Sequence, residues 1–173
     1  TPGSVVFEND LIQLIQYAPT TAKVHERPLL IVPPCINKYY ILDLQPDNSL
    51  VAHAVAQGHA VFLVSWPNAG PEQGNLGWDD YLEQGVMQAI DVALAISGAD
   101  RANTLGFCIG GTLLASALAV LAARGEDKAA SLTLLTTMLD FSNTGELGLM
   151  VSEQAVAARE ASIGRDGLLK GSE

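Results

Sequence analysis

The chain has 173 residues, of which 49% are hydrophobic, and its formal net charge is −10. This length suits one domain or a large part of one, and the negative charge argues against nucleic-acid binding through the overall field of the protein. The apolar runs are shorter than the ~20 residues that a membrane-spanning helix needs, so we expect no membrane span. The absence of a leading Met suggests a fragment of a longer protein.

The first 140 residues alternate apolar strands with helices. The predicted elements are, in chain order, strands at 4–7, 11–17 and 28–32, helices at 37–44 and 48–56, a strand at 60–65, a helix at 81–96, a strand at 103–107, a helix at 109–123 and a strand at 131–136. Asn48 is expected to cap the second helix, which Gly58 ends. Alternation of buried strands with helices predicts an α/β fold, a mostly parallel sheet with helices on both faces, and the first two strands add an antiparallel edge.

The pattern weakens after Asp140, where a helix over 151–161 is the remaining expectation and 164–173 has no clear period. Residues 67–77 are rich in Pro, Gly and Asn and are expected to form a loop. No clear linker divides the chain, so we expect residues 1–173 to form a single, incomplete domain.

Residues 106–110 have the pattern G-x-C-x-G between a predicted strand and a predicted helix, which is the context of a nucleophile elbow. Gly106 and Gly110 lack the side chains that would collide across such a tight turn. Cys108 would have a strained backbone and a thiolate stabilised by the positive end of the helix dipole, and the N–H of Ile109 would face a developing oxyanion. The alternative is a small, buried structural cysteine.

The second oxyanion donor in this fold comes from the loop after an earlier strand, here the loop after residues 28–32. Pro33 and Pro34 have no N–H group. The next free amides belong to Cys35 and Ile36, and we favour Ile36. A plain strand-ending turn, with Cys35 as a packing residue, is the alternative.

A thiol nucleophile usually needs a base and an orienting acid, which follow the nucleophile in this fold. The histidines all precede Cys108: His25, His53 and His59. They are expected to be structural or exposed. Asp140 follows Cys108, but a loop or capping role is at least as well supported. We therefore expect the base and the acid beyond Glu173.

The two cysteines, Cys35 and Cys108, lie far apart in a chain with no export signal. This usage predicts free thiols in a reducing compartment. Neither cysteine belongs to a CxxC cluster, so no metal site is expected.

The segment GFCIGGT (106–112) resembles the lipase-like box of polyhydroxyalkanoate synthases, in which Cys takes the place of the lipase Ser. The resemblance covers nearly the whole chain and is closest to the class I enzymes, the poly-3-hydroxybutyrate synthases, which favour short-chain monomers. The further segments that carry it are PLLIVPPCINKYYILDLQPDNSLV (28–51), GHAVFLVSWPNAG (58–70), ALAVLAARG (117–125) and SLTLLTTMLDF (131–141).

This resemblance implies the N-terminal part of the core of an α/β-hydrolase fold, with residues 141–173 starting a cap region associated with dimerisation. It implies an acyltransferase that polymerises (R)-3-hydroxyacyl-CoA, with 3-hydroxybutyryl-CoA as the expected substrate, through a thioester on Cys108. CoA would enter as part of the substrate and leave as a product, with no cofactor. The implied setting is cytoplasmic, in contact with the polyester chain and the granule surface.

Two other functions stay open. One is a Cys-dependent hydrolase of the same fold, similar to dienelactone hydrolases, against which the PPCINKYYILDLQP segment counts. The other is a non-catalytic module that binds granules. Because the expected base is absent, a chain limited to these 173 residues is expected to release no CoA.

Overall fold

The computed structural model describes residues 1–163, which form two compact units. The first unit comprises residues 1–67 and 78–138, and the second comprises residues 68–77 with the described residues from 139 onward. The start of a cap region at residue 141 remains a prediction. Within residues 1–163, none of the helices combines the length and the apolar content that crossing a bilayer requires.

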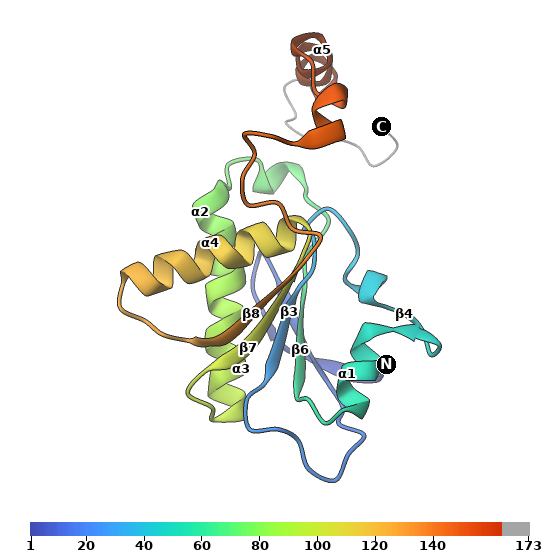
Figure 1. Ribbon diagram of the computed structural model, residues 1–173, viewed down its shortest axis with the longest axis vertical. Helices are drawn as coiled ribbons and strands as arrows, with labels where there is room; N and C mark the ends of the chain where they lie inside the picture. Colours follow the sequence, from blue (N-terminus) through green and yellow to red (C-terminus); the bar gives the residue numbers. More distant parts are fainter. Residues whose placement is uncertain (164–173) are drawn as a thin grey trace. The chain divides into compact units, whose positions relative to one another are not determined.

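The first unit is built on a sheet with the strand order β1-β2-β6-β3-β7-β8 (Figure 1). Its strands are β1 (Gly3–Glu8), β2 (Gln13–Tyr17), β3 (Leu29–Val32), β6 (Val61–Ser65), β7 (Ala102–Phe107) and β8 (Ala129–Leu135). β6, β3, β7 and β8 are parallel neighbours, whereas β1 and β2 form an antiparallel edge beside β6. This arrangement confirms the predicted mostly parallel sheet with its antiparallel edge.

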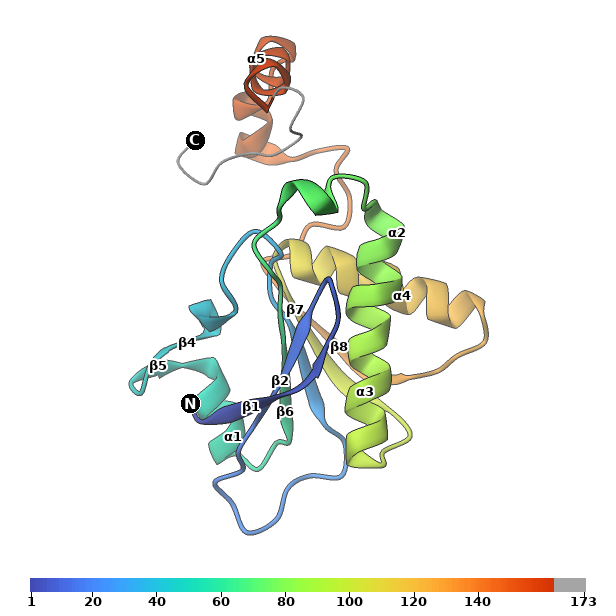
Figure 2. The same cartoon turned by 180° about the vertical axis from the view of Figure 1, so that it is seen from behind.

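Helices cover both faces of this sheet, as predicted (Figures 1 and 2). They are α1 (Leu50–Ala56), the consecutive elements α2 (Trp78–Asp80), η3 (Tyr81–Met87) and α3 (Gln88–Ser97), and α4 (Ile109–Ala123). On the α1 face, Ile31, Leu63 and Leu105 lie at paired positions of neighbouring strands and pack against Val51 and Val55. Strand alternation sends the intervening residues to the other face, where α3 and α4 contact β3 and β7.

The segment after β3 differs from its prediction. The helix expected over 37–44 is a short 3₁₀ helix, η1 (Tyr39–Leu42), followed by β4 (Asp43–Gln45), which pairs with β5 (Asn48–Ser49). The cap of α1 is Ser49 rather than Asn48, because the Ser49 hydroxyl accepts a hydrogen bond from the Ala52 N–H at 2.8 Å. That hydroxyl also donates to the Asp43 carboxylate at 2.6 Å, and this bond holds Asp43 in an extended segment.

The predicted helix over 81–96 is present, but its first two turns form the π-helix η3. The residues of the π-helix that face the core are apolar, as they would be in an α-helix. The apolar pattern of the sequence therefore does not distinguish the wider π-turns from ordinary helical turns. The helix ends at Gly98, whose φ of +70° is the left-handed conformation that glycine accepts most readily.

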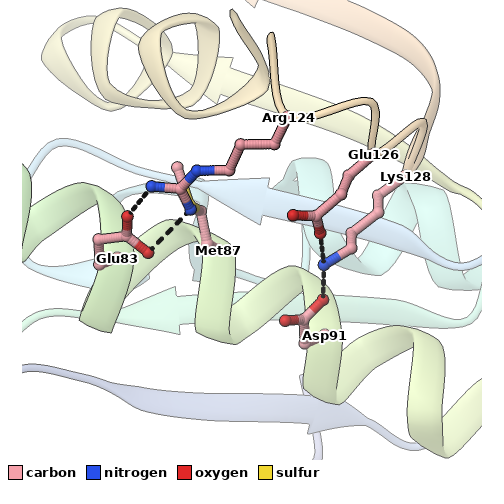
Figure 3. A network of polar contacts seen from close by, with 6 residues as sticks. All are labelled: Glu83, Met87, Asp91, Arg124, Glu126 and Lys128. Atoms are coloured by element: carbon pink, nitrogen blue, oxygen red, sulfur yellow. Dashed lines mark hydrogen bonds and ion pairs between the residues drawn. The ribbon is translucent and has the colours of Figure 1, made fainter. Parts of the chain in front are cut away.

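The far end of α4 is tied to η3 and α3 by exposed charged groups (Figure 3). The Arg124 guanidinium pairs with the Glu83 carboxylate. The Lys128 ammonium lies between two carboxylates, 2.7 Å from Asp91 and 2.6 Å from Glu126. These contacts connect the end of α4 and the turn after it to the preceding helix.

The second unit contains η2 (Pro71–Gln73), η4 (Gly145–Met150) and α5 (Glu153–Ile163). η2 interrupts the expected 67–77 loop, and α5 confirms the helix expected over 151–161. Several large apolar side chains of η4 and its flank are exposed, among them Leu147, Leu149, Met150 and Val151. The segment expected to lack a clear period, 164–173, lies outside the described residues.

Candidate active site

Cys108 occupies the turn between β7 and α4, with φ +54° and ψ −128°. An L-residue with a side chain seldom adopts a positive φ, and such strain collects at functional sites. The Cys108 N–H donates to the Leu135 carbonyl at 2.9 Å, which fixes the turn to the neighbouring strand β8. The side chain is exposed. The predicted strand-turn-helix context and the strained backbone are therefore confirmed, and the thiol is presented to solvent at the end of β7.

Gly106 and Gly110 lie where a side chain would collide with backbone. A Cβ atom at Gly110 would be 2.5 Å from the Pro33 carbonyl oxygen and closer still to that of Val32. A Cβ atom at Gly106 would be 2.9 Å from the Gly111 nitrogen. The start of α4 thus packs directly on the strand end that precedes the Pro-Pro turn, and only glycine permits this approach. The assignment of these glycines to a nucleophile elbow stays a prediction.

Ile109 is the first residue of α4, and its N–H belongs to the group of helix-start amides that have no partner within the helix. The positive end of the helix dipole lies at the same point. The Gly111 N–H instead donates to the Cys108 carbonyl at 2.9 Å. An amide beside the thiol is therefore available for an anion, and the predicted oxyanion role of Ile109 is compatible with this position but untested.

The loop after β3 forms a turn at residues 34–37. Pro34 is buried, and its carbonyl accepts a hydrogen bond from the Asn37 N–H at 3.4 Å. Cys35 and Ile36 are the central residues of this turn, so their N–H groups are not part of its hydrogen bond. Ile36 is 81% exposed, so this part of the loop is open to solvent. The expected second oxyanion donor, Ile36, also stays a prediction.

The Cys35 thiol lies close enough to Cys108 to interact with it electrostatically. Burial raises the pKa of Cys35, and the neighbouring Cys108 thiol raises it further, although a backbone hydrogen bond acts in the opposite direction. A thiol of raised pKa holds its proton and is a poor nucleophile. Of the two thiols, the exposed Cys108 is the better candidate for attack, and the half-buried Cys35 suits the expected packing role.

Thr136 is a second strained residue beside the elbow, with φ +43°. A β-branched residue in this region is a clear conformational outlier. It follows Leu135, whose carbonyl holds the Cys108 N–H, and it precedes Thr137, whose hydroxyl donates to the same carbonyl at 3.1 Å. No sequence pattern marks this position, because the residues from Leu135 to Met138 include no glycine or asparagine, the residues that most readily adopt a positive φ.

The histidines lie away from Cys108. The backbone N–H of His25 donates to the Gly58 carbonyl at 2.8 Å, and the ring centroids of His25 and His59 are 4.9 Å apart. Both residues precede parallel strands, whereas Cys108 follows one, so about 15 Å of strand separates them. Burial lowers the pKa of His59, and the nearby His25 lowers it further. With His53 exposed on α1, the expectation of structural or exposed histidines is confirmed.

Asp140 belongs to the second unit, where its carboxylate accepts a hydrogen bond from the Ser142 N–H at 2.9 Å. This bond lowers the pKa of Asp140. The contact is a local turn motif, which agrees with the loop role considered for this residue. The described residues therefore bring together a thiol, an adjacent helix-start amide and a proline-stiffened loop, whereas the histidines are remote.

Two family models match the chain. Residues 28–156 match the alpha/beta hydrolase fold, and residues 1–54 match the N-terminus of poly-beta-hydroxybutyrate polymerase (PhaC).

Curated relatives extend the same similarity. The chain is 62% identical to the poly(3-hydroxyalkanoate) polymerase subunit PhaC of Cupriavidus necator over 95% of its length. It is 46% identical to the poly(3-hydroxyalkanoate) polymerase of Methylorubrum extorquens over 99% of its length. In both cases it spans only 28% of the relative. The resemblance to polyhydroxyalkanoate synthases is confirmed.

Solved structures share the fold at low sequence identity. A putative esterase from Staphylococcus aureus matches with a TM-score of 0.63 and 16% identity, over 90% of this chain and 52% of that one. Epoxide hydrolase A from Mycobacterium thermoresistibile matches with a TM-score of 0.53 and 17% identity, over 78% of this chain and 39% of that one. These matches confirm the predicted α/β-hydrolase architecture.

Proposed function

Since the chain belongs to the α/β-hydrolase fold family and matches polyhydroxyalkanoate synthases along almost its whole length, we propose that it carries the nucleophile of a hydroxyacyl-CoA polymerase. The observation that carries the proposal is the strained, exposed Cys108 at the start of α4. The backbone amides of Ile109, the next residue in the chain, and of Ile36, in the loop after β3, are proposed as the oxyanion donors.

In the first step, the Cys108 thiolate attacks the thioester carbonyl of (R)-3-hydroxyacyl-CoA. A carbon–sulfur bond forms to Cys108, the bond to CoA breaks, and the departing CoA thiolate takes the proton that the Cys108 thiol had given to the base. One thioester replaces another, so the exchange is nearly balanced in energy. The negative charge on the carbonyl oxygen during attack is the charge that amide donors stabilise.

In the second step, the hydroxyl of another acyl group attacks the Cys108 thioester. An ester bond forms, the carbon–sulfur bond breaks, and the hydroxyl proton passes to a base. His25 and His59 precede strands that run parallel to the one that Cys108 follows, and His53 is exposed on α1, so the base and its acid are proposed to lie after residue 173. Water competes with the hydroxyl, and a covered apolar site would favour polymer over hydrolysis.

The remaining expectations follow from the same proposal. 3-Hydroxybutyryl-CoA is the proposed substrate, as for a class I enzyme, and no cofactor takes part. The polyester chain, the granule surface and a second copy of the enzyme are the proposed partners, in the cytoplasm. The chain limited to residues 1–173 is proposed to be inactive alone.

Product analysis of the full-length enzyme with 3-hydroxybutyryl-CoA tests this function. We expect CoA release together with ester-linked oligomers, and loss of both in Cys108→Ala. The matched variant Cys35→Ala should retain both. Free 3-hydroxybutyrate as the sole acyl product would contradict the polymerase and support the hydrolase alternative, and CoA release by Cys108→Ala would remove Cys108 from the mechanism.

A further inference from the structure

Trp66 follows β6 directly and lies across the end of the sheet from which the Pro-Pro turn emerges. Its side chain is 7% exposed, and its indole N–H donates to the Pro33 carbonyl oxygen at 2.9 Å. A buried indole N–H usually finds such a partner. β6 and β3 are parallel neighbours, so this bond joins the residues that directly follow two adjacent strands at the same end of the sheet.

The Pro33 carbonyl is also the point where the turn meets the nucleophile elbow. A Cβ atom at Gly110 would lie 2.5 Å from its oxygen and 2.6 Å from its carbon. The Pro33 carbonyl group therefore lies against α4 and also accepts the hydrogen bond from the Trp66 indole. Pro33 and Pro34 have no N–H to anchor the chain, so the hydrogen bond that the Pro33 carbonyl accepts from Trp66 anchors the start of the turn.

The indole itself is fixed by the π-helix. A Cβ atom at Gly85 would lie 2.8 Å from the Cη2 and Cζ3 atoms of Trp66, so a glycine is needed there for the ring to fit. The Tyr81 ring is 5.6 Å from the Trp66 ring, tilted by 33°. Single π-turns in proteins occur frequently at functional sites, and here the π-turns contact the ring that holds the turn.

We propose that Trp66 is a positioning residue, which sets the place of the Ile36 amide relative to the Cys108 sulfur through its hydrogen bond to Pro33. This inference rests on the proposed function, because the amide matters only if an oxyanion forms. Oxyanion donors act over distances of about 2.7–3.1 Å, and a displacement of about 1 Å can slow a reaction by a factor of roughly 100. Loss of the bond should therefore slow thioester attack.

Replacement of the Trp66 indole by benzothiophene, as β-(3-benzothienyl)alanine, tests this in the full-length enzyme. The replacement exchanges N–H for sulfur and leaves the ring shape almost unchanged. Two rates are measured at Cys108 by peptide mass spectrometry: acylation by 3-hydroxybutyryl-CoA, which develops an oxyanion, and alkylation by iodoacetamide, which does not. The same replacement at the exposed Trp78 is the matched control.

We expect the Trp66 replacement to slow acylation about tenfold or more while alkylation stays within about twofold, and the Trp78 replacement to change neither. Equal slowing of both reactions would overturn the proposal, because it would mean a general disturbance of the elbow. Unchanged acylation would also overturn it, while leaving the proposed function intact. Failure of the unmodified enzyme to acylate Cys108 would instead refute the proposed function, and this inference with it.

Discussion

Helix α4 begins against backbone atoms and ends among exposed charged side chains. At its start, Gly110 touches the carbonyl groups of the β3 end, and Cys108, the residue before the helix, is strained. At its end, Arg124 and the turn after it are joined to the neighbouring helix by ion pairs. Backbone groups cannot yield without moving a strand, whereas long side chains adapt through rotation. The contrast predicts that substitutions at the start of α4 cost far more than substitutions at its end.

The largest effect is expected for Gly110→Ala. The new methyl group would meet two carbonyl oxygens at distances that real Cβ contacts do not show, and overpacking against an unyielding neighbour costs about 3 kcal/mol. The matched variant is Gly125→Ala, where nothing lies within 4 Å of the added Cβ and only the φ of +78° opposes it. We expect it to cost about 1 kcal/mol.

Urea unfolding of the full-length protein with each alanine variant measures this difference. Equal losses of unfolding free energy for the two variants would mean that the backbone at the elbow accommodates a methyl group as easily as the backbone after α4.

A smaller effect is expected when the strain at Cys108 is relieved. Alanine and glycine both remove the thiol, but glycine accepts a φ of +54° without penalty. Backbone strain of this kind costs on the order of 1–3 kcal/mol, so Cys108→Gly should be more stable than Cys108→Ala by about 1 kcal/mol. The unfolding midpoints of the two variants give the comparison, and a less stable glycine variant would show that the turn is not strained.

The smallest effect is expected at the other end, for Lys128→Gln. The ion pairs of the Lys128 ammonium with Asp91 and Glu126 lie at the surface. The substitution should therefore lower the free energy of unfolding by less than about 1 kcal/mol, and this loss should disappear in 1 M salt. Asp91 and Glu126 raise the pKa of Lys128 above its usual 10.5. A raised pKa in the folded state contributes stability that is complete below 10.5 and is lost as the pH rises through the raised value.

The difference in the free energy of unfolding between wild type and Lys128→Gln should therefore be constant between pH 7 and 9 and shrink at more alkaline pH. Thermal unfolding at several pH values and salt concentrations measures it. A loss that persists in high salt would contradict a surface electrostatic origin.

The same contrast explains what the sequence could predict. The bounds of α4 and the strained turn before it follow from local signals, namely an apolar helical run and glycines on both sides of a cysteine. Ser49 caps α1 in place of the expected Asn48, because adjacent polar residues compete for that role and the contact with Asp43 favours Ser49.

Three features of the site had no local signal. The π-turns of η3 include Gly85, which lies against the Trp66 ring although the two residues are 19 positions apart in the chain. The bond from Trp66 to Pro33 depends on strands β3 and β6 being neighbours. The strained Thr136 depends on the contacts that hold the β8 end beside the elbow. Each arises from long-range packing, which a pattern of neighbouring residues does not encode.

Mapping the acyl group on the full-length enzyme shows whether Cys108 is the nucleophile. Brief exposure to 3-hydroxybutyryl-CoA, followed by acid quenching and peptide mass spectrometry, locates any thioester that forms. We expect a hydroxybutyryl adduct on the peptide that contains Cys108, and none on that peptide in Cys108→Ala. An adduct on Cys35 alone, with Cys108 unmodified, would contradict this expectation.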